Sequence, residues 1–261
     1  MKLLAAIFIS MMYLVGCQKQ PPLTNVTAEP IKIAVAAAAD LKYAFDEIAK
    51  AFQQAHPEIQ IEPTYGSSGN FFAQLSNRAP FDMFLSADRS YPRKLIEQDL
   101  AVKDSEFQYA TGHIVIWTRS DSTLDIEKLG MDVLRDSSIK NIAIANPKHA
   151  PYGRAVEAAM KNHELYDALK DRLVLGENVA QTMQFIETGA ADIGIIAQSL
   201  ALSPPLRDKG RFWLIPADSH PPLEQAGVTM NWTRNQAACT LIQEFLVSES
   251  GRSILQRYGF E

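Results

Sequence analysis

Cysteine is scarce in this chain, and its scarcity excludes one way of stabilising a fold. The 261 residues include two cysteines, Cys17 and Cys239, so a scaffold held by several disulfides is excluded. Cys239 lies in an apolar stretch with helical spacing, for which a buried and unreactive thiol is the expected state. The fold must therefore depend on apolar residues, which make up 47% of the chain. One large domain or two lobes would fit this length.

Runs of basic residues are also missing. The formal net charge is -5, and an acidic protein without a basic stretch is poorly suited to bind nucleic acid. We therefore expect no nucleic-acid partner. Any anion that this protein binds must be held by local dipoles, because the surface as a whole offers no positive field.

The chain lacks the short motifs of common enzymes. It contains no Gly-x-Ser-x-Gly elbow, no His-Glu-x-x-His pair and no Walker-type glycine loop. We predict a binding protein rather than an enzyme, without a cofactor and without a free metal cation. The histidines are scattered along the sequence: His56, His113, His149, His163 and His220.

Long apolar runs are absent after the N-terminus. Leu3–Val15 is apolar but shorter than the roughly 20 residues of a membrane-spanning helix, and Lys2 precedes it. The run ends in Leu-Val-Gly-Cys, which resembles a bacterial lipobox with Cys17 as the lipid attachment site. Residues 1–17 are thus predicted to be a lipoprotein signal peptide, and the polar, proline-rich residues 18–30 a tether. We expect an exported protein of the cell envelope, anchored to a membrane by lipid.

The first part of the remaining chain alternates between strand and helix patterns. Such alternation predicts an α/β fold with parallel-type sheets and covering helices. The strands expected here are Ile31–Val35, Ile59–Glu62 and Phe81–Leu85, and helical spacing covers Leu41–Phe52 and Phe71–Leu75.

A second set of strand and helix patterns follows without a linker, which indicates two lobes. Expected strands are Gly112–Thr118, Ile142–Ala145, Leu173–Leu175, Ile193–Ala197, Phe212–Ile215 and Ala226–Met230. Expected helices are Arg154–His163, Val179–Thr188 with Gly189 as its C-cap, and a long C-terminal helix Asn235–Arg257.

Four turns that precede helices are candidates for an anion site. Helix N-termini expose unpaired N–H groups and a partial positive charge. Taken singly, each turn is also typical of an ordinary connection, and Asp40 is placed to cap the helix after it. The turns are Ala37–Asp40, Gly66–Gly69, Pro151–Gly153 and Glu177–Val179.

Several blocks of this sequence resemble periplasmic molybdate-binding proteins, the solute receptors of molybdate ABC importers. The resemblance covers about Ile31 to Phe260 and rests on VAAAADLKYAFDEIAKAF, YGSSGNFFAQL, APFDMFLSAD, ANPKHAPYGRAVEAAM, GENVAQTMQFIETGAADIGII and LQRYGF. It implies a two-lobed periplasmic binding protein-like fold with a hinge. Lobe 1 would hold residues 31–108 plus 221–261 and lobe 2 residues 109–220, with crossings near Tyr109 and Pro221.

The resemblance also implies a function. The protein would be a monomer that captures molybdate or tungstate between its lobes, closes around the anion and docks on the permease of an ABC importer. A binding protein for another anion, such as phosphate, phosphonate or an organic acid, is the alternative. A sensor domain of a transcription regulator shares this lobe architecture but needs a DNA-binding module, where this sequence has a leader and a tether.

The site residues of the family carry over in part. The second turn matches the family serine at Ser68, beside Ser67, and the fourth matches a valine whose N–H binds the anion, at Val179. The third turn has Tyr152, where the family uses a backbone N–H.

Two family side chains are replaced. The first turn has Asp40, next to Ala39, where the family has a serine, and Ala197 stands where a tyrosine hydroxyl commonly closes the site. Tyr152 is a candidate to supply that hydroxyl, with packing at a lobe edge as the alternative. Arg154 either pairs with Asp40 and approaches the ligand, or lies exposed.

Three interpretations of Asp40 remain open. Its carboxylate could turn away and cap the helix, which would leave N–H groups to bind the anion. It could accept a proton from a partly protonated oxyanion, or it could coordinate the metal of the oxyanion directly.

Overall fold

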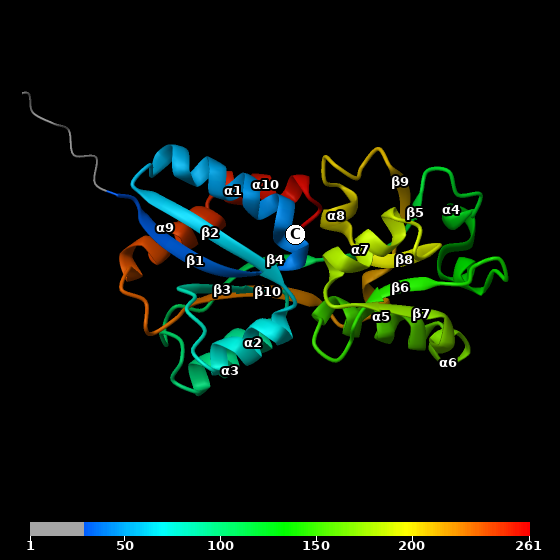
Figure 1. The fold of residues 1–261 in the computed structure, drawn as a ribbon, viewed down its shortest axis with the longest axis horizontal. Helices are drawn as coiled ribbons and strands as arrows, with labels where there is room; N and C mark the ends of the chain where they lie inside the picture. The colour runs from blue at the N-terminus through cyan, green and yellow to red at the C-terminus, as the bar shows by residue number, and fades with distance from the viewer. Residues whose placement is uncertain (1–28) are drawn as a thin grey trace, which may run out of the picture.

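The computed structural model describes residues 29–261, and these form two β-sheets with helices packed against them. The predicted signal peptide, Cys17 and most of the tether lie outside the described residues. The first sheet has the strand order β2-β1-β3-β10-β4 and the second β7-β6-β8-β5-β9. Figure 1 shows the two sheets side by side along the long axis, each with its own helices, and we call these halves the first and second lobe. The predicted two-lobed α/β fold is confirmed.

The first lobe contains both ends of the described chain. Its strands are β1 Ile31–Ala38, β2 Ile59–Gly66, β3 Met83–Ser86, β4 Phe107–Gly112 and β10 Leu223–Thr229. Its helices are η1 Ala39–Leu41, α1 Lys42–Ala55, α2 Ser68–Ser76, α3 Ser90–Glu97, α9 Gln236–Val247 and α10 Glu249–Arg257.

The second lobe is formed by the middle of the chain. Its strands are β5 Ile114–Arg119, β6 Ile142–Ala145, β7 Leu173–Gly176, β8 Ile193–Ala197 and β9 Gly210–Leu214. Its helices are α4 Ile126–Leu129, η2 Gly130–Arg135, α5 Pro151–Asn162, α6 Tyr166–Leu169, η3 Lys170–Arg172, α7 Val179–Glu187, α8 Gln198–Ala201 and η4 Ala217–Ser219.

The apolar spacing of the sequence explains these layers. In α1, Phe45, Ile48 and Phe52 lie on one face and are fully buried against the first sheet. The strand β6 is buried along its whole length, as expected for a strand covered on both faces. Gly189 ends the helical region after α7 with φ +80, which confirms its predicted role beyond the helix C-terminus.

Both sheets are mixed, because the chain leaves the first lobe and returns to it. β1 pairs in parallel with β2 and β3, and β6 with β7 and β8. The strands at the crossings run the other way: β10 is antiparallel to β3 and β4, and β5 is antiparallel to β8 and β9. The chain crosses between Gly112 and Ile114 and again between Leu214 and Leu223.

One element prediction was wrong, and strand β4 and the helices α3, α4, α6 and α8 were not predicted. The expected C-terminal helix Asn235–Arg257 is two helices, since Ser248 adopts an extended backbone with ψ 168 and its hydroxyl accepts the N–H of Gly251 at 3.2 Å as the cap of α10. The apolar periodicity continues through this break and therefore conceals it. Strand β4 was not predicted, because its sequence FQYATG alternates weakly.

The two lobes are in contact at the carboxyl ends of their parallel strands. The apolar core of the second lobe extends to Ala38, Ala39 and Ala87 of the first lobe. Within residues 29–261, no helix has the length and apolar character needed to cross a membrane.

Candidate functional site

A small cavity between the lobes brings the four predicted turns together. Its empty volume, with the open solvent at its mouth included, is about 200 Å³. Six of the seven residues predicted to bind the ligand line it, and Arg154 does not. The lining consists of Ala38, Ala39, Asp40, Gly66, Ser67, Ser68, Ala87, Ala150, Pro151, Tyr152, Asn178 and Val179.

Three helices of eight or more residues begin at this cavity. Ser67 is the N-cap of α2, and its Oγ accepts the N–H of Asn70 at 3.3 Å. Asn178 caps α7 by accepting the N–H groups of Ala180 and Gln181, both at 3.0 Å, and Val179 is the first residue of that helix. Helix α5 begins at Pro151, which has no N–H to leave unpaired. The cavity therefore lies at the positive ends of three helix dipoles.

The serine hydroxyls add donors that rotate. Ser68 is fully buried, and its Oγ accepts the N–H of Ala87 at 3.0 Å. The hydroxyl hydrogen of Ser68 remains available to an acceptor in the cavity. Such an arrangement of N–H groups and a hydroxyl suits an anion rather than a cation. Among the described residues, no three His, Cys, Asp or Glu side chains lie close enough together to bind a metal ion.

Asp40 does not cap the helix after it, so that interpretation was wrong. The short helix η1 starts after Ala38, no side chain caps it, and the Asp40 side chain is 1% exposed. Its Oδ2 accepts hydrogen bonds from the Tyr152 hydroxyl at 3.0 Å and from Gln225 Nε2 at 2.6 Å. Within residues 29–261, its Oδ1 forms no hydrogen bond.

The position of Asp40 changes its acidity. Burial raises the pKa of Asp40 to about 6, and the hydrogen bonds from Gln225 and Tyr152 oppose the rise in part. The backbone carbonyl of Asp40 accepts the Ser199 hydroxyl at 2.7 Å, which ties η1 to the second lobe. Among the described residues, this carboxyl group of the cavity wall therefore has no cationic partner.

Gln225, which donates to Asp40, and Tyr109, which donates to Gln225, were not predicted as site residues from the sequence. Gln225 is fully buried on β10, and its Oε1 accepts the Tyr109 hydroxyl at 3.0 Å. Gln225 Nε2 also lies 3.2 Å from the Tyr152 hydroxyl oxygen. A side chain at position 112 would not fit here, because a Cβ on Gly112 would lie 2.2 Å from that oxygen. The available signal was a glutamine directly before the small and apolar residues 226–228 of strand β10.

The hydroxyl of Tyr152 is hydrogen-bonded to Asp40. Its ring is buried, and burial together with the nearby Asp40 carboxyl raises the pKa of Tyr152 well above its ordinary value. Ala197, where the resemblance implies a tyrosine, is fully buried at the end of β8 and does not line the cavity. The Tyr152 hydroxyl therefore joins the lobes through the Asp40 carboxyl.

His149 forms a second contact across the lobes. Its Nδ1 lies 2.9 Å from Ser67 Oγ, and its carbonyl accepts the N–H of Gly69 at 2.9 Å. Its Nε2 lies 3.5 Å from the carboxylate of Glu177. A Cβ on Gly69 would lie 2.4 Å from the His149 carbonyl oxygen, so this backbone approach requires glycine.

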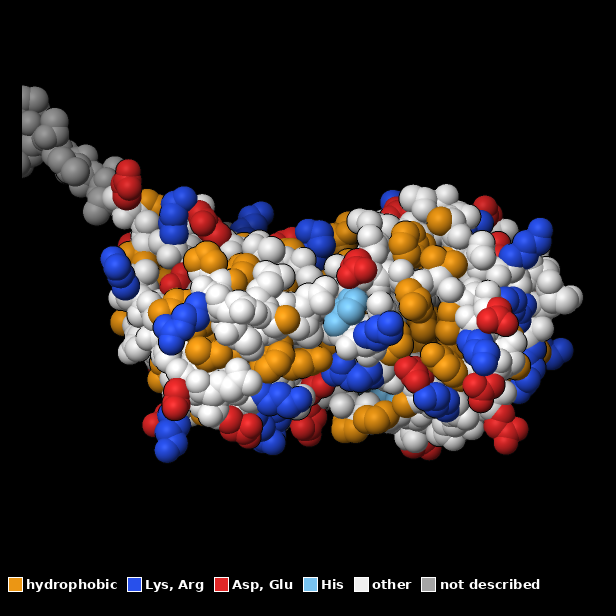
Figure 2. Space-filling model, turned by 60° about the horizontal axis from the view of Figure 1, so that its bottom comes forward, with side chains coloured by type: hydrophobic (Ala, Val, Ile, Leu, Met, Phe, Trp, Pro, Cys, Tyr) orange, Lys and Arg blue, Asp and Glu red, His pale blue; other side chains and the backbone are white. Residues whose placement is uncertain are grey.

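Arg154 lies in a larger groove beside the cavity, with an empty volume of about 1130 Å³. It does not pair with Asp40. Its guanidinium donates to Asp88 Oδ2 at 2.5 Å and to the Tyr91 hydroxyl at 3.2 Å, both in the first lobe. Figure 2 shows cationic and anionic side chains gathered together at the junction of the lobes.

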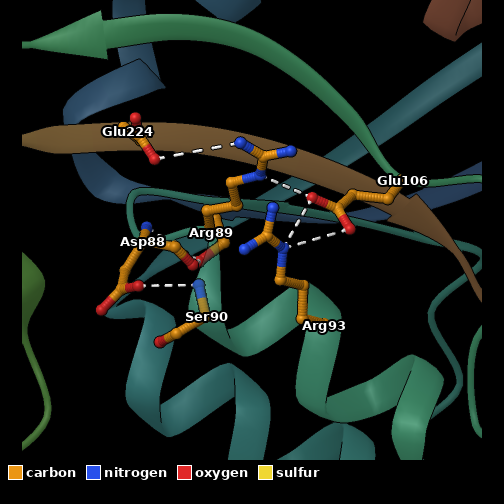
Figure 3. Close-up of polar contacts among 7 residues, drawn as sticks. Asp88, Arg89, Ser90, Arg93, Glu106 and Glu224 are labelled. Atoms are coloured by element: carbon orange, nitrogen blue, oxygen red, sulfur yellow. Dashed lines mark hydrogen bonds and ion pairs between the residues drawn. The ribbon is translucent and has the colours of Figure 1, made fainter.

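Two other cations of this groove, Arg89 and Arg93, also have acidic partners. Arg89 and Arg93 both donate to Glu106, at 2.6 and 3.1 Å, and the carboxylate of Glu224 lies 4.0 Å from Arg89 (Figure 3). In the same view Asp88 accepts the N–H of Ser90, at 2.8 Å. The groove therefore carries balanced charge, whereas the cavity offers N–H groups and a hydroxyl.

Comparisons with known proteins agree with this geometry. Residues 33–261 match the model of a family described as bacterial extracellular solute-binding protein. The molybdate-binding protein ModA of Rhodobacter capsulatus is 33% identical over 196 residues, which are 75% of each chain. YvgL of Bacillus subtilis, named as an ABC transporter substrate-binding lipoprotein, is 28% identical over 94% of this chain and 92% of its own.

A solved structure shows the same fold. The periplasmic molybdate-binding protein of Azotobacter vinelandii superposes with a TM-score of 0.82 and 28% sequence identity, over 88% of this chain and 98% of that one. The predicted resemblance to molybdate-binding proteins is confirmed, and so is the prediction of a binding protein rather than an enzyme. This chain belongs to the family of bacterial extracellular solute-binding proteins.

Proposed function

We propose that this protein captures a tetrahedral oxyanion, molybdate or tungstate first, in the cavity between its lobes and delivers it to an ABC importer. The observation that carries the proposal is the meeting of four turns at one small cavity, three of them at the start of a long helix. A tetrahedral oxyanion needs several hydrogen-bond donors that converge on it from different directions. Backbone N–H groups of the first helical turns supply such donors without any ionised side chain.

The energetics of the site fit an anion held by dipoles. Each hydrogen bond from an N–H or hydroxyl group to a charged oxygen contributes about 1.5–3 kcal/mol. The first turns of α2, α5 and α7 and the hydroxyl of Ser68 supply these donors. The site should select anions by size, because the donors come from both lobes and the distance between them is fixed when the lobes are closed around the anion.

Closure of the lobes is the proposed capture step. The cavity is bounded by η1 and α2 of the first lobe and by α5 and α7 of the second, so a ligand enters only when the lobes part. The chain connects the lobes at two places, Gly112–Ile114 and Leu214–Leu223, where the hinge would lie. Contacts of His149 and Arg154 across the lobes stabilise the closed form.

Export and anchoring complete the proposal. The lipobox that ends at Cys17 would place the protein in the cell envelope, attached by lipid, with residues 18–30 as the tether. The similarity to a Bacillus subtilis substrate-binding lipoprotein supports this assignment. An ABC permease is then the expected partner of the closed form.

Calorimetric titration of residues 27–261 with molybdate, tungstate, sulfate and phosphate tests the function. We expect molybdate and tungstate to bind and sulfate to be excluded. Ser68→Ala should weaken binding about tenfold by removing one hydrogen bond to the anion. Ser203→Ala, which removes a buried serine of the second lobe outside the cavity, is the matched control. Binding of none of the four anions would refute the proposal.

A further inference from the structure

The two carboxyl oxygens of Asp40 have unequal surroundings. Oδ2 accepts hydrogen bonds from Tyr152 and Gln225, at 3.0 and 2.6 Å. Oδ1 is buried and, among the described residues, has no hydrogen-bond partner. Asp40 lines the cavity in which the oxyanion is proposed to bind. A buried carboxyl oxygen without a partner is costly, and a ligand in the cavity is the group that could satisfy it.

An ionised carboxylate and a fully ionised oxyanion cannot satisfy each other. Both offer acceptor oxygens and negative charge, so their contact would be repulsive. A single proton between Oδ1 and a ligand oxygen changes that contact into a short, charge-assisted hydrogen bond. The same proton also lowers the total negative charge of the buried pair by one unit.

We propose that the cavity binds its oxyanion together with one proton, which lies between Asp40 Oδ1 and a ligand oxygen. This inference rests on the proposed function and adds to it the protonation state of the captured species. Molybdate and tungstate are fully ionised near neutral pH, so the complex must take the proton from solution. Hydrogenphosphate, by contrast, carries a proton of its own into the site. Asp40 thereby becomes the residue that couples oxyanion capture to pH.

In the part of the chain that the structure describes, no cation near Asp40 would hold its carboxyl group ionised. Tyr152 from α5, Gln225 from β10, Tyr109 from β4 and Ser199 from α8 face it, and all four are uncharged. Burial raises the pKa of Asp40 to about 6, so protonation near neutral pH is accessible.

The charged side chains of the neighbouring elements form contacts with one another and not with Asp40. On α1, Lys42 and Asp46 pair with each other at 3.5 Å on the surface. The tyrosine Tyr65 of β2 donates to Asp46 at 2.5 Å. Helix α7 has no charged residue before Glu187, in its last turn. Within residues 29–261, therefore, no ion pair competes with the ligand for this carboxyl group.

His149 is the alternative source of a proton effect. Imidazoles are the usual cause of pH dependence near neutrality, and His149 contacts Ser67 at the cavity. A proton linkage that depends on Asp40 and not on His149 is what the proposal requires. The variants Asp40→Asn and His149→Gln separate the two, because asparagine presents a permanent N–H donor in place of the protonated carboxyl.

The experiment is calorimetric titration of residues 27–261 with tungstate at pH 6.5, 7.5 and 8.5, in buffers with different ionisation enthalpies. For the wild type we expect uptake of one proton at pH 7.5 and above, and an affinity that falls about tenfold per pH unit. Asp40→Asn should bind tungstate without proton uptake and more tightly than the wild type at pH 8.5. His149→Gln should keep the pH slope.

Several results would overturn the inference. A wild-type affinity that is constant from pH 6.5 to 8.5, a slope that persists in Asp40→Asn, or a slope that disappears in His149→Gln would each do so while tungstate binding remained. If neither the wild type nor Asp40→Asn binds tungstate at pH 6.5, the proposed function itself fails, and the inference fails with it. The wild-type titration decides the question even if a variant does not fold.

Discussion

Replacing Asp40 by asparagine should stabilise the ligand-free protein at high pH. The structure buries a carboxyl group whose pKa rises from 3.8 to about 6, mainly because burial disfavours its charged form. A shift of about two units corresponds to about 3 kcal/mol, since each unit is about 1.4 kcal/mol. Asparagine has nearly the same shape and can accept the bonds of Tyr152 and Gln225, but it never ionises.

The sign of the effect follows from the raised pKa. The folded protein binds this proton more tightly than the unfolded chain does, so the stabilising contribution is complete below pH 3.8. It is lost as the pH rises through about 6. Between pH 4 and pH 8 the wild type should therefore lose about 3 kcal/mol relative to Asp40→Asn.

Urea unfolding of both proteins at several pH values between 4 and 8 measures this difference. The quantity of interest is its change with pH, because constant effects of the substitution cancel. Asp208→Asn is the control, since that side chain is 85% exposed and its loss should produce no such trend. A stability difference that stays flat, or that favours the wild type as the pH rises, would refute the reasoning.

Three further predictions concern the contacts across the lobes and the buried thiol. Gly69→Ala should weaken oxyanion binding by at least about tenfold in calorimetry, because the added Cβ would meet the His149 carbonyl. Urea unfolding of this variant should show unchanged or higher stability. A wild-type affinity would contradict the contact between the lobes at this position. Arg154→Gln should raise the Kd at most about fivefold in calorimetry, because its half-exposed pair with Asp88 contributes about 1 kcal/mol or less; a loss of a hundredfold would indicate that Arg154 contacts the ligand. Burial raises the pKa of Cys239 to about 12. In a protein of residues 27–261, this thiol should therefore resist a disulfide reagent at pH 8 until urea unfolds the protein. Rapid labelling of the folded protein would contradict the burial of Cys239.

Local patterns of the sequence predicted most of the fold and part of the site. The alternation of strands and helices predicted the lobes and the turns before α2, α5 and α7, and the family resemblance named Ser68, Tyr152 and Val179 within those turns, all of which line the cavity. These signals are local, because a strand end followed by a helix start lies within a few residues of sequence. The meeting of the four turns in one cavity needed the structure.

The environment of Asp40 could not be predicted in the same way. Asp40 and Gln225 are 185 residues apart, and Asp40 and Tyr152 are 112 apart, so no local pattern reports their contact. An aspartate before a helical stretch usually caps it, and here the chain forms the short helix η1 first, which turns the side chain into the cavity wall. The pairing of Arg154 with Asp88 could not be predicted for a related reason, since Asp88 lies on the other lobe.

The central claim is that an oxyanion binds between the lobes at the helix N-termini. A crystal structure of residues 27–261 with tungstate, with tungsten located by its anomalous scattering, tests this claim most directly. We expect one tungsten site, in the cavity lined by Asp40, Ser68, Tyr152 and Val179. A tungsten site in the groove of Arg89, Arg93 and Arg154, with the cavity empty, would contradict it.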